Sequence, residues 1–173
     1  WTRARRQFEA NRTGNARNTL GALPASQTPD AKALDLAISS PMGYLARQPG
    51  NWNTTRAGRE LAALAIQRIA ANDPRAAANA LEKLQGRMQE SERQWAWSQI
   101  GLQAAKKHYP EAVAWFAQAG SAPLSDEGYQ WKVRAALRAH DWSMVLATIS
   151  EMPPALAAQP EWVYWLGRAY KAG

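Results

Sequence analysis

An internal repeat is the feature that most restricts how this chain can fold. The segment Asp73–Ala80 aligns with Tyr109–Phe116, 36 residues further along. A second step, of 32 residues, relates His108 to His140. Residues 15–24 match residues 144–153, with apolar residues at equal places and a closing proline. Periods of this length are typical of α-solenoids, in which each helical hairpin buries its apolar faces only against its neighbours.

Composition agrees with a chain made of helices. Alanine, which loses least on entering a helix, is the commonest residue at 36 of 173, whereas valine and isoleucine are scarce. The ten prolines fall between apolar-periodic segments or in first helical turns. The pattern predicts helices over residues 2–11, 14–22, 29–39, 54–71, 74–86, 91–107, 110–119, 125–139, 142–151 and 160–172.

Two of these segments share a signature in which an aromatic residue precedes a small one. Trp97 and Ile100 come before Gly101, and Trp162 and Leu166 come before Gly167. The glycine lets two helices approach closely, and the aromatic ring fills the groove between hairpins. This signature resembles the first helix of a tetratricopeptide repeat. We therefore expect an all-α fold, an α-solenoid or superhelix of tetratricopeptide-like hairpins.

Both ends of the sequence have a helical pattern. We therefore expect residues 1–173 to form a single superhelical segment of a longer protein. The chain has no cysteine and only two histidines, so we expect no metal and no cofactor. No stretch approaches the roughly 18–20 apolar residues of a membrane span, and we expect no transmembrane segment.

The carboxylates and histidines have simple structural interpretations. Ser91 followed by Gln94 has the spacing of a capping box, and Glu90 and Glu92 suit a first helical turn. The aspartates at 73 and 141 are expected helix N-caps, as is the serine at 125. The histidines at 108 and 140 are expected near helix C-termini. No catalytic residue is predicted within these 173 residues.

Nine tryptophans and a net charge of +7 together suggest a surface that binds a polymer. The two features separate along the chain, however. Seven tryptophans lie in the second half and are expected in the core of the repeat, whereas the positive charge is densest at five early arginines. A stacking platform for nucleic acid needs both in one groove, so we expect no nucleic-acid partner. The five arginines are Arg3, Arg5, Arg6, Arg12 and Arg17.

The second half of the chain also resembles a known family. Its pattern begins with Trp131-x-Val-Arg-Ala-Ala-Leu-Arg-Ala139, continues with Asp141-Trp142 and a Met-Pro stop, and ends with Pro160-x-Trp162-x-Tyr164-Trp165-x-Gly-Arg168-Ala. This pattern resembles the superhelical region of soluble lytic murein transglycosylases, which precedes their catalytic domain. Residues 59–74 are similar to the same region, so the resemblance covers most of the chain.

The resemblance implies a periplasmic enzyme that cleaves the MurNAc–GlcNAc β-1,4 bond of peptidoglycan and leaves 1,6-anhydroMurNAc ends. In that family a glutamate in a Glu-Ser motif, followed by a Gly-Leu-Met-Gln segment, acts as acid and then base. Glu90-Ser91 lacks the Gly-Leu-Met-Gln segment, so the lysozyme-like catalytic domain is expected to be absent here. The segment would then act as scaffold and guide for glycan strands, with protein partners in cell-wall synthesis as a further expectation.

Arg134 and Arg138, one helical turn apart on the resembling stretch, are the candidate substrate-guide residues, although a solvated helix face explains them equally well. The alternative function is a tetratricopeptide-like module that binds a protein segment in its concave groove.

Overall fold

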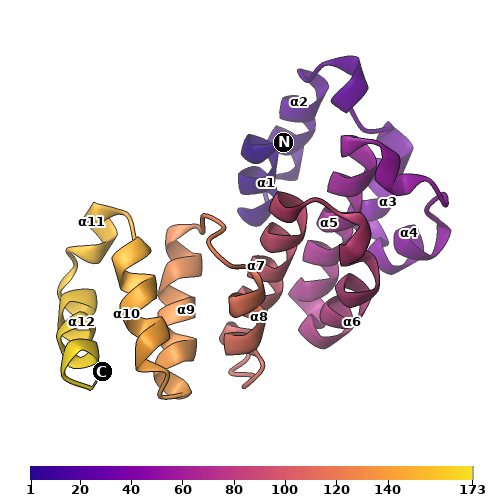
Figure 1. Ribbon diagram of the computed structural model, residues 1–173. Helices are drawn as coiled ribbons and strands as arrows, with labels where there is room; N and C mark the ends of the chain where they lie inside the picture. The colour runs from indigo at the N-terminus through magenta and orange to yellow at the C-terminus, as the bar shows by residue number, and fades with distance from the viewer. Residues whose placement is uncertain (173) are drawn as a thin grey trace. The chain divides into compact units, whose positions relative to one another are not determined.

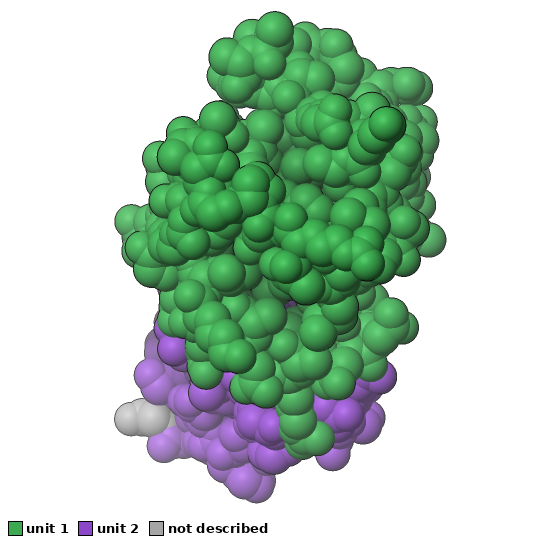
Figure 2. All heavy atoms as spheres, turned by 90° about the vertical axis from the view of Figure 1, so that its right-hand side faces the viewer, with its two compact units in different colours: residues 1–96 green, residues 97–173 purple. Residues whose placement is uncertain are grey.

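The computed structural model describes residues 1–172, and within this range every regular element is helical (Figure 1). Twelve α-helices and three short 3-10 turns follow one another along the described chain. The predicted all-α fold of helical hairpins is confirmed. The chain divides into two compact units, Trp1–Ala96 and Trp97–Gly173, which Figure 2 shows in green and purple.

In the first unit, consecutive helices pair as hairpins. Helix α1 contacts α2, α3 contacts α4, and α5 contacts α6. Helix α5 also packs against α3 and α4, and ten of its residues are buried, which makes it the central element of the unit. The helices are α1 (Thr2–Glu9), α2 (Thr13–Gly21), α3 (Ala31–Ser39), α4 (Pro41–Arg47), α5 (Arg56–Asn72), α6 (Pro74–Leu84) and the start of α7 (Glu90–Lys106). The turns are η1 (Ala25–Gln27), η2 (Trp52–Thr54) and η3 (Gln85–Arg87).

The second unit continues the same pattern. Helix α9 contacts α8 and α10, and α12 contacts α10 and α11. One apolar cluster joins the end of α7 to α8 and α9, and another joins α9, α10 and α12. The helices are α8 (Ala112–Gln118), α9 (Asp126–Arg138), α10 (Trp142–Glu151), α11 (Pro154–Ala157) and α12 (Pro160–Ala172). Each unit thus has a core of its own.

The tryptophans lie in these cores, as predicted. Trp97 and Trp162 are among the largest fully buried side chains, and none of the nine tryptophans of the described chain is exposed. Gly101 allows a close approach, since a Cβ at this position would lie 2.8 Å from the ring of Phe116 on α8. The same prediction for Gly167 is wrong, because a Cβ there would have no described atom within 4 Å.

The repeat seen in the sequence corresponds to a repeated helix-ending turn. His108 and His140 both adopt positive φ, at 61° and 55°, and Asn11 does so at 58°. After each of them, the next N–H donates to a carbonyl five residues back: Arg12 to Gln7, Tyr109 to Ala104 and Asp141 to Ala136. This is a C-terminal capping motif in which the left-handed residue satisfies the last carbonyls. The predicted positions of both histidines at helix ends are therefore confirmed.

Most predicted N-caps are also confirmed. The side chains of Asp73, Ser125 and Asp141 each accept a backbone N–H three residues on, at 3.0–3.1 Å. The capping box predicted from Ser91 and Gln94 is shifted by two residues, because α7 begins at Glu90 and the N–H of Gln89 donates to Glu92 Oε1 at 2.9 Å. Helices α4 and α11 were not predicted, because the seven and four residues that they contain are too few to show a helical pattern, although each has a proline in its first turn.

Candidate functional site

Helix α9 carries both arginines that the sequence singles out. Ser125 starts the helix by accepting the N–H of Gly128 at 3.0 Å. The face that carries Tyr129 and Val133 is buried in the second unit. Arg134 and Arg138 are four residues apart, which places them on neighbouring turns of one helix. Their surroundings differ, however.

Arg134 is built into the aromatic packing. Its guanidinium carbon lies 4.8 Å from the ring centroid of Trp131 and 5.8 Å from that of Trp162. These are cation–π distances, and Trp162 is fully buried. Arg134 therefore joins α9 to α12. Its guanidinium faces two indole rings, and its side chain is only partly exposed, which leaves less of it for a ligand.

Arg138 remains available to solvent. It is exposed in the last turn of α9, where a cation is favoured by the helix dipole. Among residues 1–172, no carboxylate forms an ion pair with it. Its side chain lines a pocket of about 180 Å³ that residues from α7 to α9 enclose.

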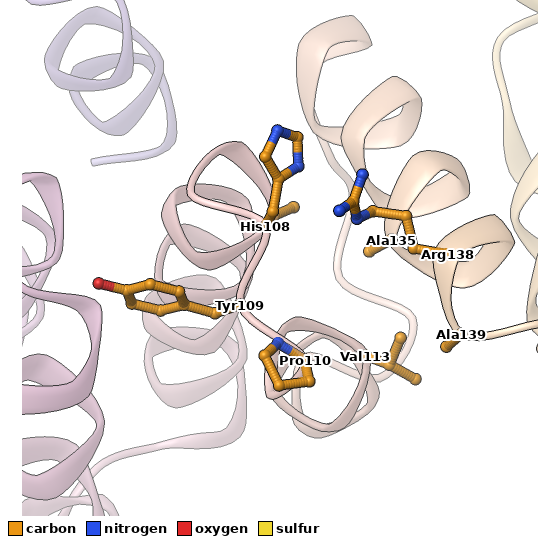
Figure 3. Close-up of a pocket in the computed structure, with 8 residues that line it drawn as sticks. His108, Tyr109, Pro110, Val113, Ala135, Arg138 and Ala139 are labelled. Atoms are coloured by element: carbon orange, nitrogen blue, oxygen red, sulfur yellow. The ribbon is translucent and has the colours of Figure 1, made fainter.

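The pocket has an apolar lining and a polar rim. Figure 3 shows the side chains of His108 and Arg138 on the same side of the pocket, with the guanidinium of Arg138 extending toward His108, whereas Tyr109 points away from it. Such a volume is below that of pockets for drug-sized ligands, so it fits a small group or the end of a chain. The apolar lining consists of Ala105, Pro110, Val113, Ala135 and Ala139.

The turn at the end of α7 positions the imidazole at this rim. His108 donates its backbone N–H to Ala105 O at 3.0 Å and adopts a φ of 61°. Its ring centroid lies 6.4 Å from that of Trp131 on α9. The sequence predicted the helix end but not the pocket, because the pocket exists only where α9 packs beside this turn. The 32-residue step that relates His108 to His140 was the one signal pointing to the position.

The early arginines are largely occupied within the first unit. Arg5 forms a two-bond ion pair with Glu60, with Nε 2.9 Å from Oε2. Arg6 pairs with Glu9, and Arg17 pairs with Asp35. Three of the five arginines that suggested a basic surface therefore neutralise carboxylates of the same chain.

Glu60 and Glu92 are the carboxylates most deeply buried, at 1% exposure each. Glu92 accepts the Nε–H of Arg59 at 3.0 Å and 3.1 Å, and Glu60 accepts from Arg5. Because arginine donors occupy the oxygens of both carboxylates, neither is free to transfer a proton to a ligand. Sequence reasoning missed these pairs because the partners are 33 and 55 residues apart.

Trp95 on α7 adds a direct contact between α7 and α1 to these ion pairs. Its indole Nε1–H donates to Glu9 Oε1 on α1 at 2.7 Å, and the guanidinium of Arg5 lies 5.4 Å from its ring centroid. Together these six side chains link α1, α5 and α7, which are far apart in sequence. We call them the buried ion-pair network: Arg5, Glu9, Arg59, Glu60, Glu92 and Trp95.

Lys132 is a buried cation on the other face of α9, at 8% exposure. Burial lowers the pKa of its ammonium group, and the charge of Glu151 partly opposes this change. Within residues 1–172 there is no cluster of three or more side chains suited to holding a metal ion. None of the described helices is both long enough and apolar enough to span a membrane.

Comparison with known proteins identifies a solved structure with a similar fold. No protein-family profile matches the chain, and no curated protein matches its sequence. Among solved structures, the chain is similar to an inactive mutant of lytic transglycosylase Slt from Pseudomonas aeruginosa, with 24% identity and a TM-score of 0.66. The match covers 99% of this chain. The chain has the fold of part of a lytic transglycosylase.

The chain spans about 28% of the length of lytic transglycosylase Slt. At this level of identity the likeness establishes the fold, and it agrees with the family resemblance found in the second half of the sequence. Because the match covers 99% of the chain, it includes residues of both compact units.

Proposed function

We propose that this chain is a non-catalytic helical segment of a soluble lytic transglycosylase. The longer protein cleaves the MurNAc–GlcNAc β-1,4 bond of peptidoglycan and leaves 1,6-anhydroMurNAc ends. The observation that carries the proposal is the match to lytic transglycosylase Slt over 99% of the chain. The family pattern on α9, α10 and α12 supports the proposal independently of the structural match, because it comes from the sequence motif alone.

The occupied carboxylates support a scaffold role for this segment. Transglycosylation needs a carboxyl group that can give and take a proton at the glycosidic oxygen. Glu60 and Glu92 are held by arginines, and Glu90 lies in the first turn of α7, where Gln94 Nε2 donates to it at 3.1 Å. In this proposal the acid and base belong to another part of the longer protein, the lysozyme-like catalytic domain.

Peptidoglycan strands are the proposed partner of the longer enzyme, and the periplasm is its proposed location. Of the two candidate guide residues, the geometry favours Arg138, which is exposed and unpaired within the described chain. The guanidinium of Arg134 forms cation–π contacts with the rings of Trp131 and Trp162. A guide role on α9 therefore rests mainly on Arg138.

Incubation with purified sacculi tests the scaffold role. The 173-residue chain and the longer protein that contains it are each added to sacculi, and the turbidity is followed over time. We expect turbidity to fall with the longer protein and to stay constant with the chain alone. Solubilisation by the chain alone would contradict the absence of chemistry in this segment.

Co-sedimentation tests the guide role separately. The chain is centrifuged with sacculi, and the bound fraction is compared for the wild type, Arg138→Gln and Arg134→Gln, with Arg168→Gln as an exposed control on α12. We expect Arg138→Gln to reduce the bound fraction most and Arg168→Gln to leave it unchanged. Equal retention of all variants would remove the guide role and leave the scaffold role.

A further inference from the structure

The pocket between the end of α7, α8 and α9 combines a cationic rim with a small apolar floor. We propose that it binds the terminal carboxylate of a peptide whose last residue has a small aliphatic side chain. This inference does not depend on the proposed function, since it rests on the lining of the pocket alone. Figure 3 shows the two rim side chains together above the floor.

Charge at the rim selects an anion. Arg138 is permanently charged and pairs with no acid in residues 1–172, unlike Arg5, Arg17 and Arg59 of the first unit. A guanidinium presents parallel N–H donors that match the two oxygens of a carboxylate. The imidazole of His108 adds a further donor from the opposite element. The rim therefore offers a carboxylate donors from helix α9 and from the turn that follows α7.

The floor suits a small apolar group such as an aliphatic side chain. Ala105 and Ala135 are buried at 3% and 6% exposure, and their short side chains, with Val113, leave the volume of about 180 Å³ open. A sugar ring would bring several hydroxyl groups that need polar partners, which this floor lacks.

A chain terminus presents the two required groups together. In a C-terminal residue the carboxylate and the side chain leave the same carbon, so the carboxylate reaches the rim while a methyl or isopropyl group enters the floor. An internal aspartate or glutamate would bring its backbone amide groups against apolar atoms. The geometry therefore favours a C-terminal alanine or valine.

The protein itself provides matched substitutions for a test. His108 and His140 have equivalent left-handed turns, and Asn11 shows that asparagine is tolerated in the same turn. His108→Asn thus removes the imidazole with the turn intact, and His140→Asn is its control. Ala139→Leu fills the floor from an exposed position, so the core is not disturbed.

Nuclear magnetic resonance titration of the chain with acetyl-Ala-Ala tests the proposal, with the C-terminal amide of the same peptide and acetyl-Phe-Phe as comparisons. We expect saturable shifts of the amide signals of Ala135 and Ala139, with a dissociation constant on the order of a millimolar for acetyl-Ala-Ala. We expect Arg138→Gln to weaken binding about tenfold, since one charge-assisted contact is lost. We expect His108→Asn to weaken binding less and Ala139→Leu to abolish it, whereas Arg168→Gln and His140→Asn retain it.

Three outcomes would overturn the proposal. Equal binding of the amide would show that no carboxylate is recognised. Equal binding of acetyl-Phe-Phe would show that the floor does not select its occupant. Unchanged binding by Arg138→Gln and Ala139→Leu, or no saturable shift with acetyl-Ala-Ala, would show that the pocket is not the site.

Discussion

The two compact units build similar helical hairpins but stabilise them differently. In the first unit, buried ion pairs connect helices that are distant in sequence: Arg5 with Glu60 and Arg59 with Glu92. In the second unit, large aromatic rings fill the core, and Arg134 contacts Trp131 and Trp162 through their faces. Buried ion pairs thus join helices of the first unit beside its apolar core, whereas aromatic packing dominates the core of the second.

This difference explains which arginines remain exposed and without an ion-pair partner. The first unit has the greater positive excess, but several of its arginines pair with carboxylates of the same unit, as Arg17 does with Asp35. The second unit has nearly balanced charge, with seven Lys/Arg and six Asp/Glu, yet it leaves Arg138 exposed beside a pocket. Net charge along the sequence is therefore a poor guide to where a ligand would bind.

Trp162→Ala is the largest expected disruption of the second unit. This side chain is fully buried between α9, α10 and α12, so its loss should lower the free energy of unfolding by about 3–5 kcal/mol. Urea unfolding followed by circular dichroism measures this. Tyr170→Ala, at an exposed position, is the control and should cost less than about 0.5 kcal/mol. Equal costs for the two variants would refute the aromatic account of this unit.

Glu60→Gln tests the buried ion-pair network of the first unit. The change leaves the largely buried guanidinium of Arg5 without its anion, and the expected cost is about 3 kcal/mol in the free energy of unfolding. A double variant, Arg5→Met with Glu60→Met, should recover most of this loss, because neither charge remains buried. Asp35→Asn, at an exposed pair, should change stability by less than about 1 kcal/mol. A loss no larger than that of Asp35→Asn would show that the network does not hold this unit together.

Gly101→Ala and Gly167→Ala form a matched pair within the aromatic unit. At Gly101 a new Cβ would meet the Phe116 ring at 2.8 Å, so we expect a loss of about 1–3 kcal/mol. At Gly167 the space is open, and alanine should stabilise α12 by roughly 0.5–1 kcal/mol. Thermal melts of both variants measure the difference. Changes of the same sign would contradict the described packing.

Asp73→Ala and Asp141→Ala compare one type of cap in the two units. Each aspartate accepts a backbone N–H at the start of a helix, and its loss should cost about 1 kcal/mol. We expect similar costs, since caps act locally whatever stabilises the core. Urea midpoints measured on both variants check this, and a cost in one unit several times that in the other would show that the cap is coupled to the core.

Lys132→Met should give the smallest change, and its sign depends on pH. Burial lowers the pKa of Lys132 in the folded chain, so the unfolded chain holds this proton more tightly. The resulting penalty is full below the folded pKa and is relieved as pH rises toward the unfolded value of about 10.5. We therefore expect Lys132→Met to stabilise the chain at neutral pH and to lose this advantage near pH 10. Thermal melts against exposed Lys171→Met measure the difference, and a gain that does not change with pH would refute the charge explanation.

Sequence reasoning predicted what depends on local pattern. Helices α10 and α12 lie at the predicted residues, and the N-caps at Asp73 and Asp141 were recognised from their positions before helices. The burial of the tryptophans was predicted from the size of their rings and from their spacing along the repeat. These features depend on residues within one or two turns, so the sequence contains the necessary information.

Features that join distant segments were not predictable in the same way. The pairing of Arg5 with Glu60 needs the placement of α1 beside α5, and no local signal identifies the partner. Arg134 and Arg138 appeared equivalent in sequence. In the structure, Trp162 on α12 contacts Arg134 through its ring face but does not contact Arg138 in this way. Helices α4 and α11 were missed because a few residues after a proline form too short a pattern.

Mass spectrometry of the products released from sacculi tests the central claim most directly. The longer protein that contains this chain is incubated with sacculi, and the soluble muropeptides are separated and weighed. The account predicts 1,6-anhydroMurNAc ends from the longer protein and no soluble muropeptide from the 173-residue chain. Reducing sugar ends from the longer protein, or any cleavage product from the chain alone, would contradict it.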